Sequence, residues 1–471
     1  MRRSRKILAG SSAVVVLVAA YATLDAVDIV PGVLTTADAP REPVPLPGES
    51  APPQNVRVPS APQLPQQTGT LKGPMPDRAA LRAAIAPLVG AKSLGTTALD
   101  VRDAKTGTRL YQKAPDAALT PASITKVLSA YAVAKTLGAD RTLATTAVSG
   151  GDGKVVLVAG GDTALGTGAG DPDAVRGHAG LGDLAQQVAI KLKAEGRTEV
   201  QISWDLSYAP GPLQASTWSQ DVVDQGFTTR ISMLGLDEDR SDPGNAPPQD
   251  PAKSASEAFV KALQRQGITA TVGQKTTAPT DAKQLGVVRS APLSAVLGLA
   301  MRSSDNAMIE SLVRQGAAAQ GVPGDTTSVT AWVVGVLRAD GIDVRGVRLR
   351  DAAGLADGTT IPARVITDVL MRGVTGKAPA FQEVVAQFPV ASLNGTLDDR
   401  FFIKGAEAGR GIVRAKTGSL PGVSSLAGTL VTQDGRELVF TIVSNGKAAA
   451  GPVQTRADLD RVISALAKCG C

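Results

Sequence analysis

The stretch LTPASITKVLSAYAVAKTLG, residues 119–138, is the most informative part of the sequence. It combines the pattern of a buried helix with a serine and a lysine that can react together. Apolar residues occupy most faces of this stretch, so the pattern predicts a helix enclosed by the rest of the protein. Thr120 is a candidate N-cap, and Pro121 suits the first helical position. Ser123 and Lys126 stand three residues apart, so we expect their side chains to share one helix face.

This serine and lysine are suited to nucleophilic chemistry. A serine needs a base to become a nucleophile, and burial is expected to lower the pKa of Lys126 toward that of a useful base. Backbone N–H groups in the first helical turn lack partners, so the N–H of Ser123 is free to bind an oxyanion. The spacing alone is a weak signal, because Ser444 and Lys447 share it, although that copy leaves a strand into a loop.

A second element is SSDNAMIE, where Ser304 and Asn306 place a hydroxyl and an amide on a stretch with a helical pattern. A helix is a rigid support for a site. Ser392 and Asn394 form a rival copy, but Asn394 precedes a glycine, and Asn-Gly is typical of a turn. We therefore predict that Ser304 and Asn306 lie beside Ser123.

A third element, AKTG, occurs twice. The copy at residues 104–107 lies between two short strand-like runs, and its flanking aspartate and glycine indicate an ordinary hairpin turn. The copy containing Lys416, Thr417 and Gly418 leads into strand-rich sequence. A lysine and a threonine on a strand edge can hold a carboxylate, while Gly418 lets another backbone come close. The second copy is therefore the candidate binding element.

The residue inventory disfavours other chemistries. The sole histidine, His178, lies in a glycine-rich loop, which disfavours a Ser-His-Asp triad or a zinc hydrolase, so no metal is expected. Asp398 and Asp399 are adjacent and are expected in a solvated turn rather than as a catalytic carboxylate pair. The only cysteines, Cys469 and Cys471, favour a frayed tail, with a strained local disulfide or an intermolecular pair as alternatives.

The N-terminus predicts export. Four cations among the first six residues precede an apolar run over 7–22, which ends in a small-x-small pattern. These features are typical of a secretory signal, either cleaved or retained as a membrane anchor, so we expect an extracytoplasmic location in the cell envelope. Nine prolines within residues 40–65 predict an extended tether between this segment and the globular part.

Length and charge limit the possible partners. The 471 residues are enough for two or three domains, and the net charge of +6 is small for this length. Aromatic residues make up 3% of the chain, which leaves few surfaces on which bases could stack. No nucleic-acid partner is therefore expected, and the membrane is expected to be contacted only through an uncleaved N-terminal segment.

The order of elements predicts an α/β fold with an insertion. Residues from about 140 to 288 contain glycine-rich loops and short strand-like runs, unlike the helical sequence on either side. The chain ends in a clear hairpin followed by an amphipathic helix. Helices and strands from both ends are therefore expected to share one domain. The predicted division is a signal peptide or membrane anchor (1–38), a proline-rich linker (39–76), the first part of the catalytic domain (77–139), an inserted subdomain (140–288), the second part (289–468) and a cysteine-containing tail (469–471).

The three elements occur in the order S-x-x-K, S-x-N and K-T-G, which resembles the signature of β-lactamases and penicillin-binding proteins. More narrowly, the chain resembles the D-alanyl-D-alanine carboxypeptidases/endopeptidases of the penicillin-binding protein 4 type. The long gap between the first two elements and the stretches VLVAGGDTAL, ISWDLSYAPGPLQASTW and NGTLDDRF carry this likeness. The resemblance implies a transpeptidase-like domain in which helices flank an antiparallel sheet and a large subdomain is inserted.

The resemblance also implies a catalytic set. Ser123 would attack the carbonyl of the penultimate D-Ala of a peptidoglycan stem peptide or a cross-bridge bond, and Lys126 would take its proton. Ser304 would relay a proton toward the leaving amine, while Asn306 would hold the amide on the acyl side. Water would then hydrolyse the acyl-enzyme without a metal or organic cofactor.

A substrate-binding set follows from the same resemblance. Lys416 and Thr417 would bind the terminal carboxylate, and Gly418 would allow close approach of the backbone. The N–H groups of Ser123 and Ser419 would form the oxyanion hole. β-Lactam antibiotics would mimic the substrate and acylate Ser123.

One stretch departs from the family pattern. The family usually has Asp-x-Ser-Gly-Leu-Ser where this chain reads DAAGLAD, with Ala353 and Ala356 at the serine positions. The change is expected to affect substrate placement or local packing more than acylation. Two alternatives stay open: a β-lactamase or esterase on the same scaffold, and a non-catalytic protein that binds or organises the cell wall.

Overall fold

The computed structural model describes residues 73–241, 246–446 and 451–469. Every described residue belongs to one compact unit, Leu71–Cys471. The expected signal or anchor (1–38), nearly all of the expected linker (39–76) and Cys471 lie outside the described residues. Within the described part, no helix has the length and apolar character needed to cross a membrane.

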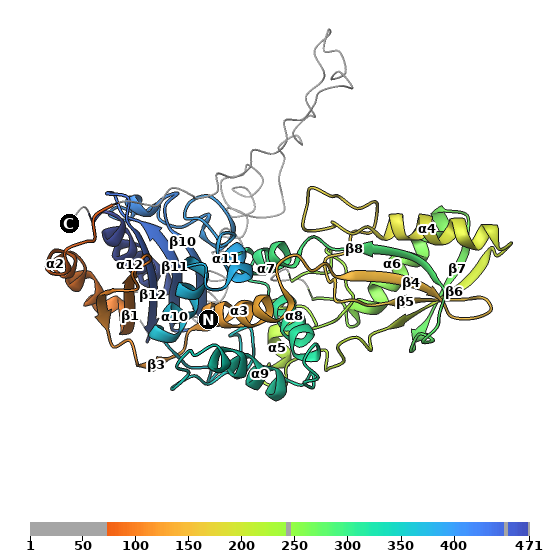
Figure 1. The fold of residues 1–471 in the computed structure, drawn as a ribbon, viewed down its shortest axis with the longest axis horizontal. Helices are drawn as coiled ribbons and strands as arrows, with labels where there is room; N and C mark the ends of the chain where they lie inside the picture. Colours follow the sequence, from red (N-terminus) through yellow and green to blue (C-terminus); the bar gives the residue numbers. More distant parts are fainter. Residues whose placement is uncertain (1–72, 242–245, 447–450, 470–471) are drawn as a thin grey trace, which may run out of the picture. The chain divides into compact units, whose positions relative to one another are not determined.

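A five-stranded antiparallel sheet joins the two ends of the described chain (Figure 1). Its order is β10-β11-β12-β1-β2, with strands β1 (Thr96–Asp103), β2 (Arg109–Lys113), β10 (Arg414–Leu420), β11 (Val423–Val431) and β12 (Glu437–Asn445). Thr96 lies opposite Asn445, so the first strand pairs with the last along its whole length. The expected C-terminal hairpin is β11–β12, which confirms that prediction.

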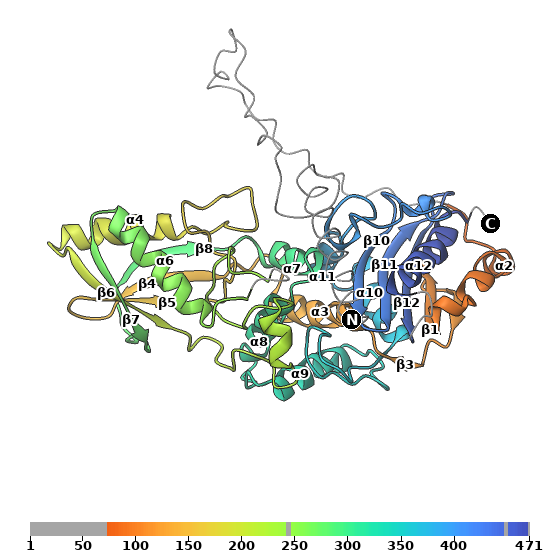
Figure 2. The same cartoon turned by 180° about the vertical axis from the view of Figure 1, so that it is seen from behind.

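Alternate residues of β12 face two different cores, as the two-residue period of a strand requires. Leu438 and Ile442 belong to one hydrophobic cluster, while Val439 and Val443 belong to another. The first cluster includes residues of α2 (Arg78–Val89) and α12 (Gly451–Ala467), and the second includes residues of α3 (Lys126–Leu137) and α10 (Ala363–Val374). Helices therefore cover both faces of the sheet (Figure 2).

The helix α3 is the centre of the second core. All its residues from Lys126 to Ala134 are buried, which confirms the predicted enclosed helix. The edge of the Tyr131 ring meets the Phe381 ring, with 5.3 Å between the ring centroids. The elements around it include α7 (Leu293–Arg302), α8 (Asn306–Ala318), α9 (Thr326–Ala339), α11 (Pro379–Val385) and the short pair β3 (Ala118–Leu119) and β9 (Ile361–Pro362).

Residues 140–288 form a second sheet with its own hydrophobic core. The order β7-β6-β5-β4-β8 comprises β4 (Ala144–Ser149), β5 (Lys154–Val158), β6 (Glu199–Asp205), β7 (Thr269–Lys275) and β8 (Gln284–Arg289), with helices α4 (Leu181–Ala194), α5 (Gln220–Asp224) and α6 (Pro251–Arg265). Part of this segment packs outside the core of the second sheet. Ala215, Trp218 and Ile231 instead belong to the core around α3. The segment therefore contributes directly to the domain that carries α3.

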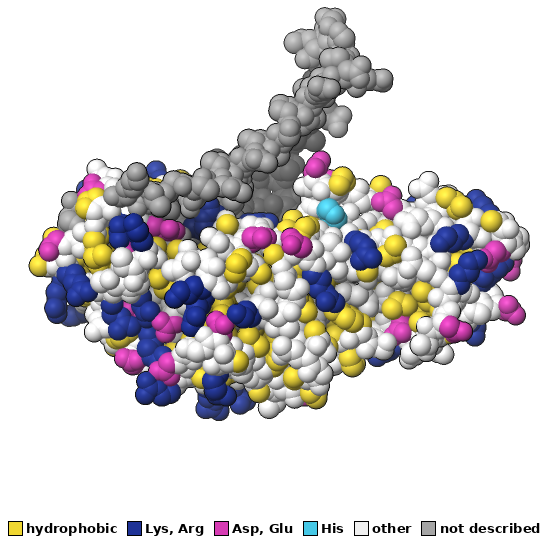
Figure 3. Space-filling view, in the orientation of Figure 1, with side chains coloured by type: hydrophobic (Ala, Val, Ile, Leu, Met, Phe, Trp, Pro, Cys, Tyr) yellow, Lys and Arg dark blue, Asp and Glu magenta, His cyan; other side chains and the backbone are white. Residues whose placement is uncertain are grey.

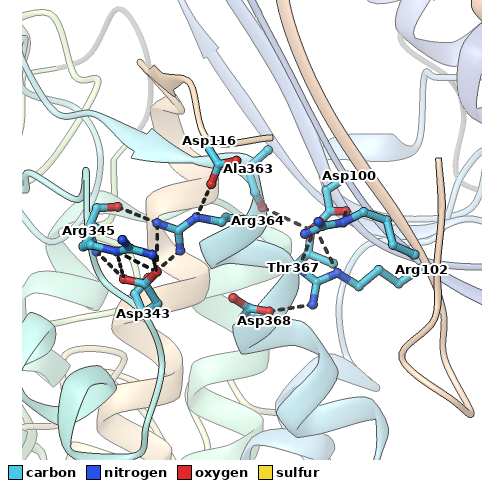
Figure 4. Close-up of polar contacts among 10 residues, drawn as sticks. Asp100, Arg102, Asp116, Asp343, Arg345, Ala363, Arg364, Thr367 and Asp368 are labelled. Atoms are coloured by element: carbon cyan, nitrogen blue, oxygen red, sulfur yellow. Dashed lines mark hydrogen bonds and ion pairs between the residues drawn. The ribbon is translucent and has the colours of Figure 1, made fainter. Parts of the chain in front are cut away.

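A network of ion pairs fixes α10 against the first sheet (Figure 4). Arg102 of β1 reaches Asp100 of the same strand at 2.7 Å and Asp368 of α10 at 2.6 Å. At the start of α10, Arg364 lies 3.5 Å from Asp343 in the preceding loop. On the molecular face in Figure 3, basic and acidic side chains are interspersed rather than separated into large fields of one sign.

Candidate active site

The turn that carries Ser123 differs from the sequence-based prediction. Residues Ala122–Thr125 form a 3₁₀ turn, and α3 begins only at Lys126. Thr120 does not cap the helix, because Pro121 precedes the 3₁₀ turn and Thr125 precedes α3. Its N–H instead donates to Asn445 Oδ1 at 2.8 Å, and its carbonyl accepts from Asn445 Nδ2 at 2.9 Å. Asn445 ends β12, so a strand of the sheet anchors the segment just before the serine.

Lys126 is completely buried and is the centre of the site. Its Nζ lies 2.9 Å from Ser123 Oγ, 2.6 Å from Asn306 Oδ1 and 2.8 Å from the Ala353 carbonyl oxygen. An ammonium has three donors, so these acceptors satisfy all of them. The predicted contact between Ser123 and Lys126 is present, and Ser123 itself is only half-buried.

Burial controls the protonation of Lys126. Loss of water around the amine lowers the pKa of Lys126 to about 8, although the negative charges of Asp351, Asp305 and Glu310 limit the fall. A lysine with this pKa is neutral in a useful fraction of molecules near neutral pH, so it can accept a proton from a hydroxyl.

Ser304 lies in a turn, so its expected position within a helix is wrong. The helix α7 ends at Arg302, and α8 begins at Asn306 with Asp305 as its N-cap. Ser304 has a φ of 57°, in the left-handed region that non-glycine residues rarely adopt. The turn directs both side chains to the site, because Asn306 accepts from Lys126 and Ser304 accepts from Lys416.

The second AKTG copy lies on β10, at one edge of the first sheet. Lys416 is fully buried, and its Nζ lies 2.8 Å from both Ser304 Oγ and the Thr417 carbonyl oxygen. Burial lowers the pKa of Lys416 well below its ordinary value, and the cation of Lys126 lowers it further. Thr417 Oγ1 bonds to Thr396 Oγ1 at 2.7 Å, whereas Ser419 is exposed.

At Gly418, β10 lies so close to the turn that carries Ser123 (the serine turn) that there is no room for a side chain. A Cβ on Gly418 would lie 2.6 Å from the Pro121 carbonyl oxygen, 2.2 Å from Ser425 Oγ and 3.1 Å from the Ser123 nitrogen. Ser425 Oγ also donates to the Pro121 carbonyl at 2.6 Å, so β11 supports the same turn. The structure thus brings all three sequence elements together.

The serines of the two rival sequence matches, Ser392 and Ser444, make hydrogen bonds to groups other than Lys126. Ser392 Oγ donates to the Arg400 carbonyl at 2.6 Å, and Ser444 Oγ donates to the Leu94 carbonyl at 2.5 Å. Lys447 lies outside the described residues. The early AKTG copy is a hairpin turn in which Asp103 accepts from the Thr106 N–H at 2.7 Å, as expected.

The structure adds partners that sequence reasoning missed. The carbonyl of Ala353 accepts from Lys126, so the stretch DAAGLAD, which departs from the family pattern, contacts the candidate base. Glu310 accepts from the N–H groups of Ala352 and Ala353 at 2.7 and 2.9 Å. From the inserted segment, the Phe227 carbonyl accepts from Asn306 Nδ2 at 2.9 Å. Backbone acceptors of this kind leave no signal in residue type.

Other candidates lie apart from this cluster or differ from expectation. Asp398 and Asp399 are exposed in a turn, as expected. Cys469 is not frayed, because it is buried at 6% exposure and disulfide-bonded. The described residues contain no group of three or more side chains suited to holding a metal.

A cavity of about 490 Å³ lies elsewhere, lined by residues that include Arg102, Lys105, Asp343 and Asp368. It contains none of the predicted site residues, and two of its lining side chains, Arg102 and Asp368, already pair with each other. We assign no ligand to it.

A half-buried serine joined to a buried, weakly basic lysine on an α/β scaffold defines a serine hydrolase of the acyl-enzyme class. The family model of D-Ala-D-Ala carboxypeptidase 3 (S13) matches residues 81–248 and 245–466. The chain belongs to this family, and it is a serine-type peptidase.

Relatives and solved structures agree with this assignment. A carboxypeptidase of Mycobacterium tuberculosis is 33% identical over 430 residues, which cover 88% of this chain and 91% of that protein. Carboxypeptidase DacB of Mycolicibacterium smegmatis is 33% identical over 408 residues, covering 85% and 86%. Penicillin-binding protein 4 of Haemophilus influenzae has the same fold, with a TM-score of 0.64, 19% identity and coverage of 82% of this chain and 98% of that chain. The expected resemblance and fold class are confirmed.

Proposed function

We propose that this protein removes the terminal D-Ala from peptidoglycan stem peptides through an acyl-enzyme on Ser123. One observation carries the proposal: the buried Nζ of Lys126 lies 2.9 Å from the half-buried Oγ of Ser123. Membership of a family of D-Ala-D-Ala carboxypeptidases supports this substrate class.

In the proposed acylation step, neutral Lys126 takes the proton of Ser123 as its Oγ bonds to the carbonyl carbon of the penultimate D-Ala. The tetrahedral oxyanion then collapses and the C–N bond breaks. The leaving amine receives the proton that Lys126 took from Ser123, passed through the hydroxyl of Ser304, so that Lys126 becomes neutral again. Asn306 and the Ala353 carbonyl hold Lys126 in place throughout, which is supported by their contacts at 2.6 and 2.8 Å.

In the proposed binding step, Lys416 and Thr417 bind the terminal carboxylate. Burial disfavours the charged form of Lys416, and a bound carboxylate restores it because opposite charges in a buried site stabilise each other. The N–H groups of Ser123 and Ser419 receive the oxyanion. The close approach of β10 to the Ser123 nitrogen at Gly418 supports this pairing.

Deacylation returns the enzyme to its starting state. A water attacks the ester carbonyl while neutral Lys126 takes one of its protons. The bond between Ser123 Oγ and the acyl carbon then breaks, Lys126 returns the proton to Oγ, and the shortened stem peptide leaves. A β-lactam follows the same acylation path, but its ring nitrogen stays attached to the acyl group. A structure of the Haemophilus influenzae protein in complex with a β-lactam supports such binding in this fold.

Labelling with a fluorescent penicillin, followed by peptide mass spectrometry, tests the nucleophile. We expect one adduct, on Ser123, that is lost in Ser123→Ala and retained in Ser392→Ala, the matched variant of the rival serine. Labelling of Ser123→Ala would contradict the assignment. An adduct that turns over within seconds would instead indicate a β-lactamase, and an unlabelled wild type would favour a wall-binding protein without catalysis.

Digestion of defined muropeptides tests the substrate. We expect free D-Ala from pentapeptide monomers, and the same assay detects cleavage of cross-linked dimers as a second activity. We further propose that the protein acts outside the cytoplasm, on the basis of its basic and apolar N-terminal sequence. Fractionation of cells expressing the full chain, with and without residues 1–38, checks this location.

A further inference from the structure

A buried ion pair joins the inserted segment to the turn that carries Ser304 and Asn306. Arg240 Nε lies 2.8 Å from Asp305 Oδ2, and its Nη2 lies 2.5 Å from Oδ1, so the pair is bidentate. The side chains are 8% and 6% exposed. Bidentate pairs fix orientation as well as charge. Other contacts from the segment to this region run from Phe227 to Asn306, from Ser232 to Ser311 and from Gly161 to Gln315.

Asp305 is the centre of that turn. Its Oδ1 caps α8 by accepting from the Met308 N–H at 2.9 Å, and its own N–H donates to the Ala300 carbonyl at 3.1 Å. The preceding residue, Ser304, adopts a left-handed backbone, which persists only where neighbouring contacts enforce it. Because Asp305 lies between Ser304 and Asn306, the ion pair with Arg240 helps to fix the positions of both residues.

Asp305 also acts on the catalytic lysine. Burial opposes the ionisation of Asp305, but the charge of Arg240 outweighs it and holds the pKa of this carboxyl below its ordinary value. The resulting carboxylate favours the protonated form of Lys126. Within the described part, the charged groups that act on Lys126 besides Asp305 are Glu310 of α8, Asp351 of the loop after α9, and Lys416 of β10. Beside Arg240 lies Asp162.

We propose that Arg240 is a positioning residue for the reaction: it holds the Ser304–Asn306 turn and neutralises Asp305, so that Lys126 can lose its proton. Through Arg240, the inserted segment thereby takes part in catalysis. The inference rests on the proposed role of Lys126 as the base. Without the charge of Arg240, the Asp305 carboxylate would favour the protonated form of Lys126 more strongly, so a smaller fraction of the lysine would be neutral at pH 7.

The test measures the protonation of Lys126 directly, by NMR titration of ¹³C-labelled lysine side chains, in wild type, Arg240→Met, Asp305→Asn and the double variant. Arg240→Met is expected to raise the pKa of Lys126, leaving about tenfold less neutral lysine at a given pH. Asp305→Asn is expected to lower it, and the double variant is expected to return it close to the wild-type value. The rate of penicillin acylation at pH 7 should change in the opposite direction to this pKa: it should be lower in Arg240→Met, higher in Asp305→Asn and close to wild type in the double variant.

The matched control is Arg436→Met, which breaks another buried bidentate pair. Arg436 Nε and Nη2 lie 2.5 and 2.9 Å from the oxygens of Asp103, at the far end of β1 from the serine turn. Both methionine variants should lose stability, but only Arg240→Met should move the Lys126 titration. An unchanged titration in Arg240→Met, or an equal change in Arg436→Met, would overturn the proposal.

The experiments distinguish failure of the proposed role of Arg240 from failure of the proposed function. If Arg240→Met does not fold, Asp305→Asn still tests the charge effect, and an unchanged Lys126 titration in that variant contradicts it. If wild type forms no penicillin adduct, the proposed function fails, whereas the titration still reports whether Arg240 and Asp305 set the protonation of Lys126.

Discussion

Lys416 Nζ lies 2.8 Å from Ser304 Oγ, although the two residues are 112 positions apart in the sequence. Once a bound carboxylate restores the charge of Lys416, its amine has only donors, so the Ser304 oxygen is the acceptor in this contact. The hydrogen of the Ser304 hydroxyl is then free to point toward a substrate nitrogen. Lys416 thus orients the proposed proton relay in addition to binding a carboxylate.

The first prediction concerns Lys416→Ala. Loss of a charged hydrogen-bonding partner typically costs about 2–3 kcal/mol, so we expect kcat/KM to fall roughly 100-fold on substrates with a free terminal carboxylate. Amidated analogues should lose less, because they lack the charge that Lys416 binds. The measurement compares kcat/KM for matched acid and amide peptides. Equal losses on both would remove the carboxylate role and leave only the contact with Ser304.

The second prediction concerns pH. Because burial lowers the pKa of Lys126 to about 8, the neutral base accumulates as pH rises toward that value. The second-order rate constant for penicillin acylation should therefore rise about tenfold per pH unit below pH 8 and level off above it. Lys135→Gln, at a half-exposed lysine of the same helix, should leave this profile unchanged. A flat profile between pH 6 and 9 would rule out Lys126 as the titrating base.

The contacts that depend on local spacing along the chain could be predicted from the sequence. Ser123 and Lys126 meet because three residues nearly complete a helical turn, and the 3₁₀ geometry of the serine turn does not change that. The left-handed turn at Ser304 was missed, although Asp305 is a preferred N-cap residue and could have marked the start of α8 there.

Contacts between distant backbone groups could not be predicted. The Ala353 carbonyl at Lys126 and the Phe227 carbonyl at Asn306 depend on how two loops fold, and every residue type carries a carbonyl. The anchoring of Thr120 by Asn445 similarly joins residues 325 positions apart, so the local capping signal at Thr120 was overridden by a tertiary contact.

The third prediction concerns Gly418→Ala. The added methyl would lie 2.2 Å from Ser425 Oγ and 2.6 Å from the Pro121 carbonyl, so the serine turn must move. We expect a loss of about 1–3 kcal/mol in stability and a fall of roughly 100-fold in acylation rate. Gly335→Ala, in α9 with no atom within 4 Å of the new methyl, is the control and should fold and react as wild type. Wild-type acylation by Gly418→Ala would show that the turn tolerates displacement.

The fourth prediction concerns Glu310→Gln and stability. Burial, followed by the charge of Asp351, raises the pKa of Glu310 to about 8 from an ordinary value of 4.5. The folded protein then binds more protons than the unfolded chain between these values, so the contribution of Glu310 to stability is lost as pH rises through that window. Glutamine keeps an acceptor for the N–H groups of Ala352 and Ala353 but does not titrate.

Urea unfolding of wild type and Glu310→Gln at pH 5, 6, 7 and 8 measures this effect. The variant should gain stability relative to wild type as pH rises, by a few kcal/mol across the range. Lys126 does not confound the comparison, because its lowered pKa makes stability rise only between about pH 8 and its ordinary value of 10.5. Glu383→Gln, at an exposed position of α11, should follow the wild-type curve. Parallel curves for wild type and Glu310→Gln would mean that Glu310 is ionised throughout, with its charge offset by the two N–H groups it accepts from.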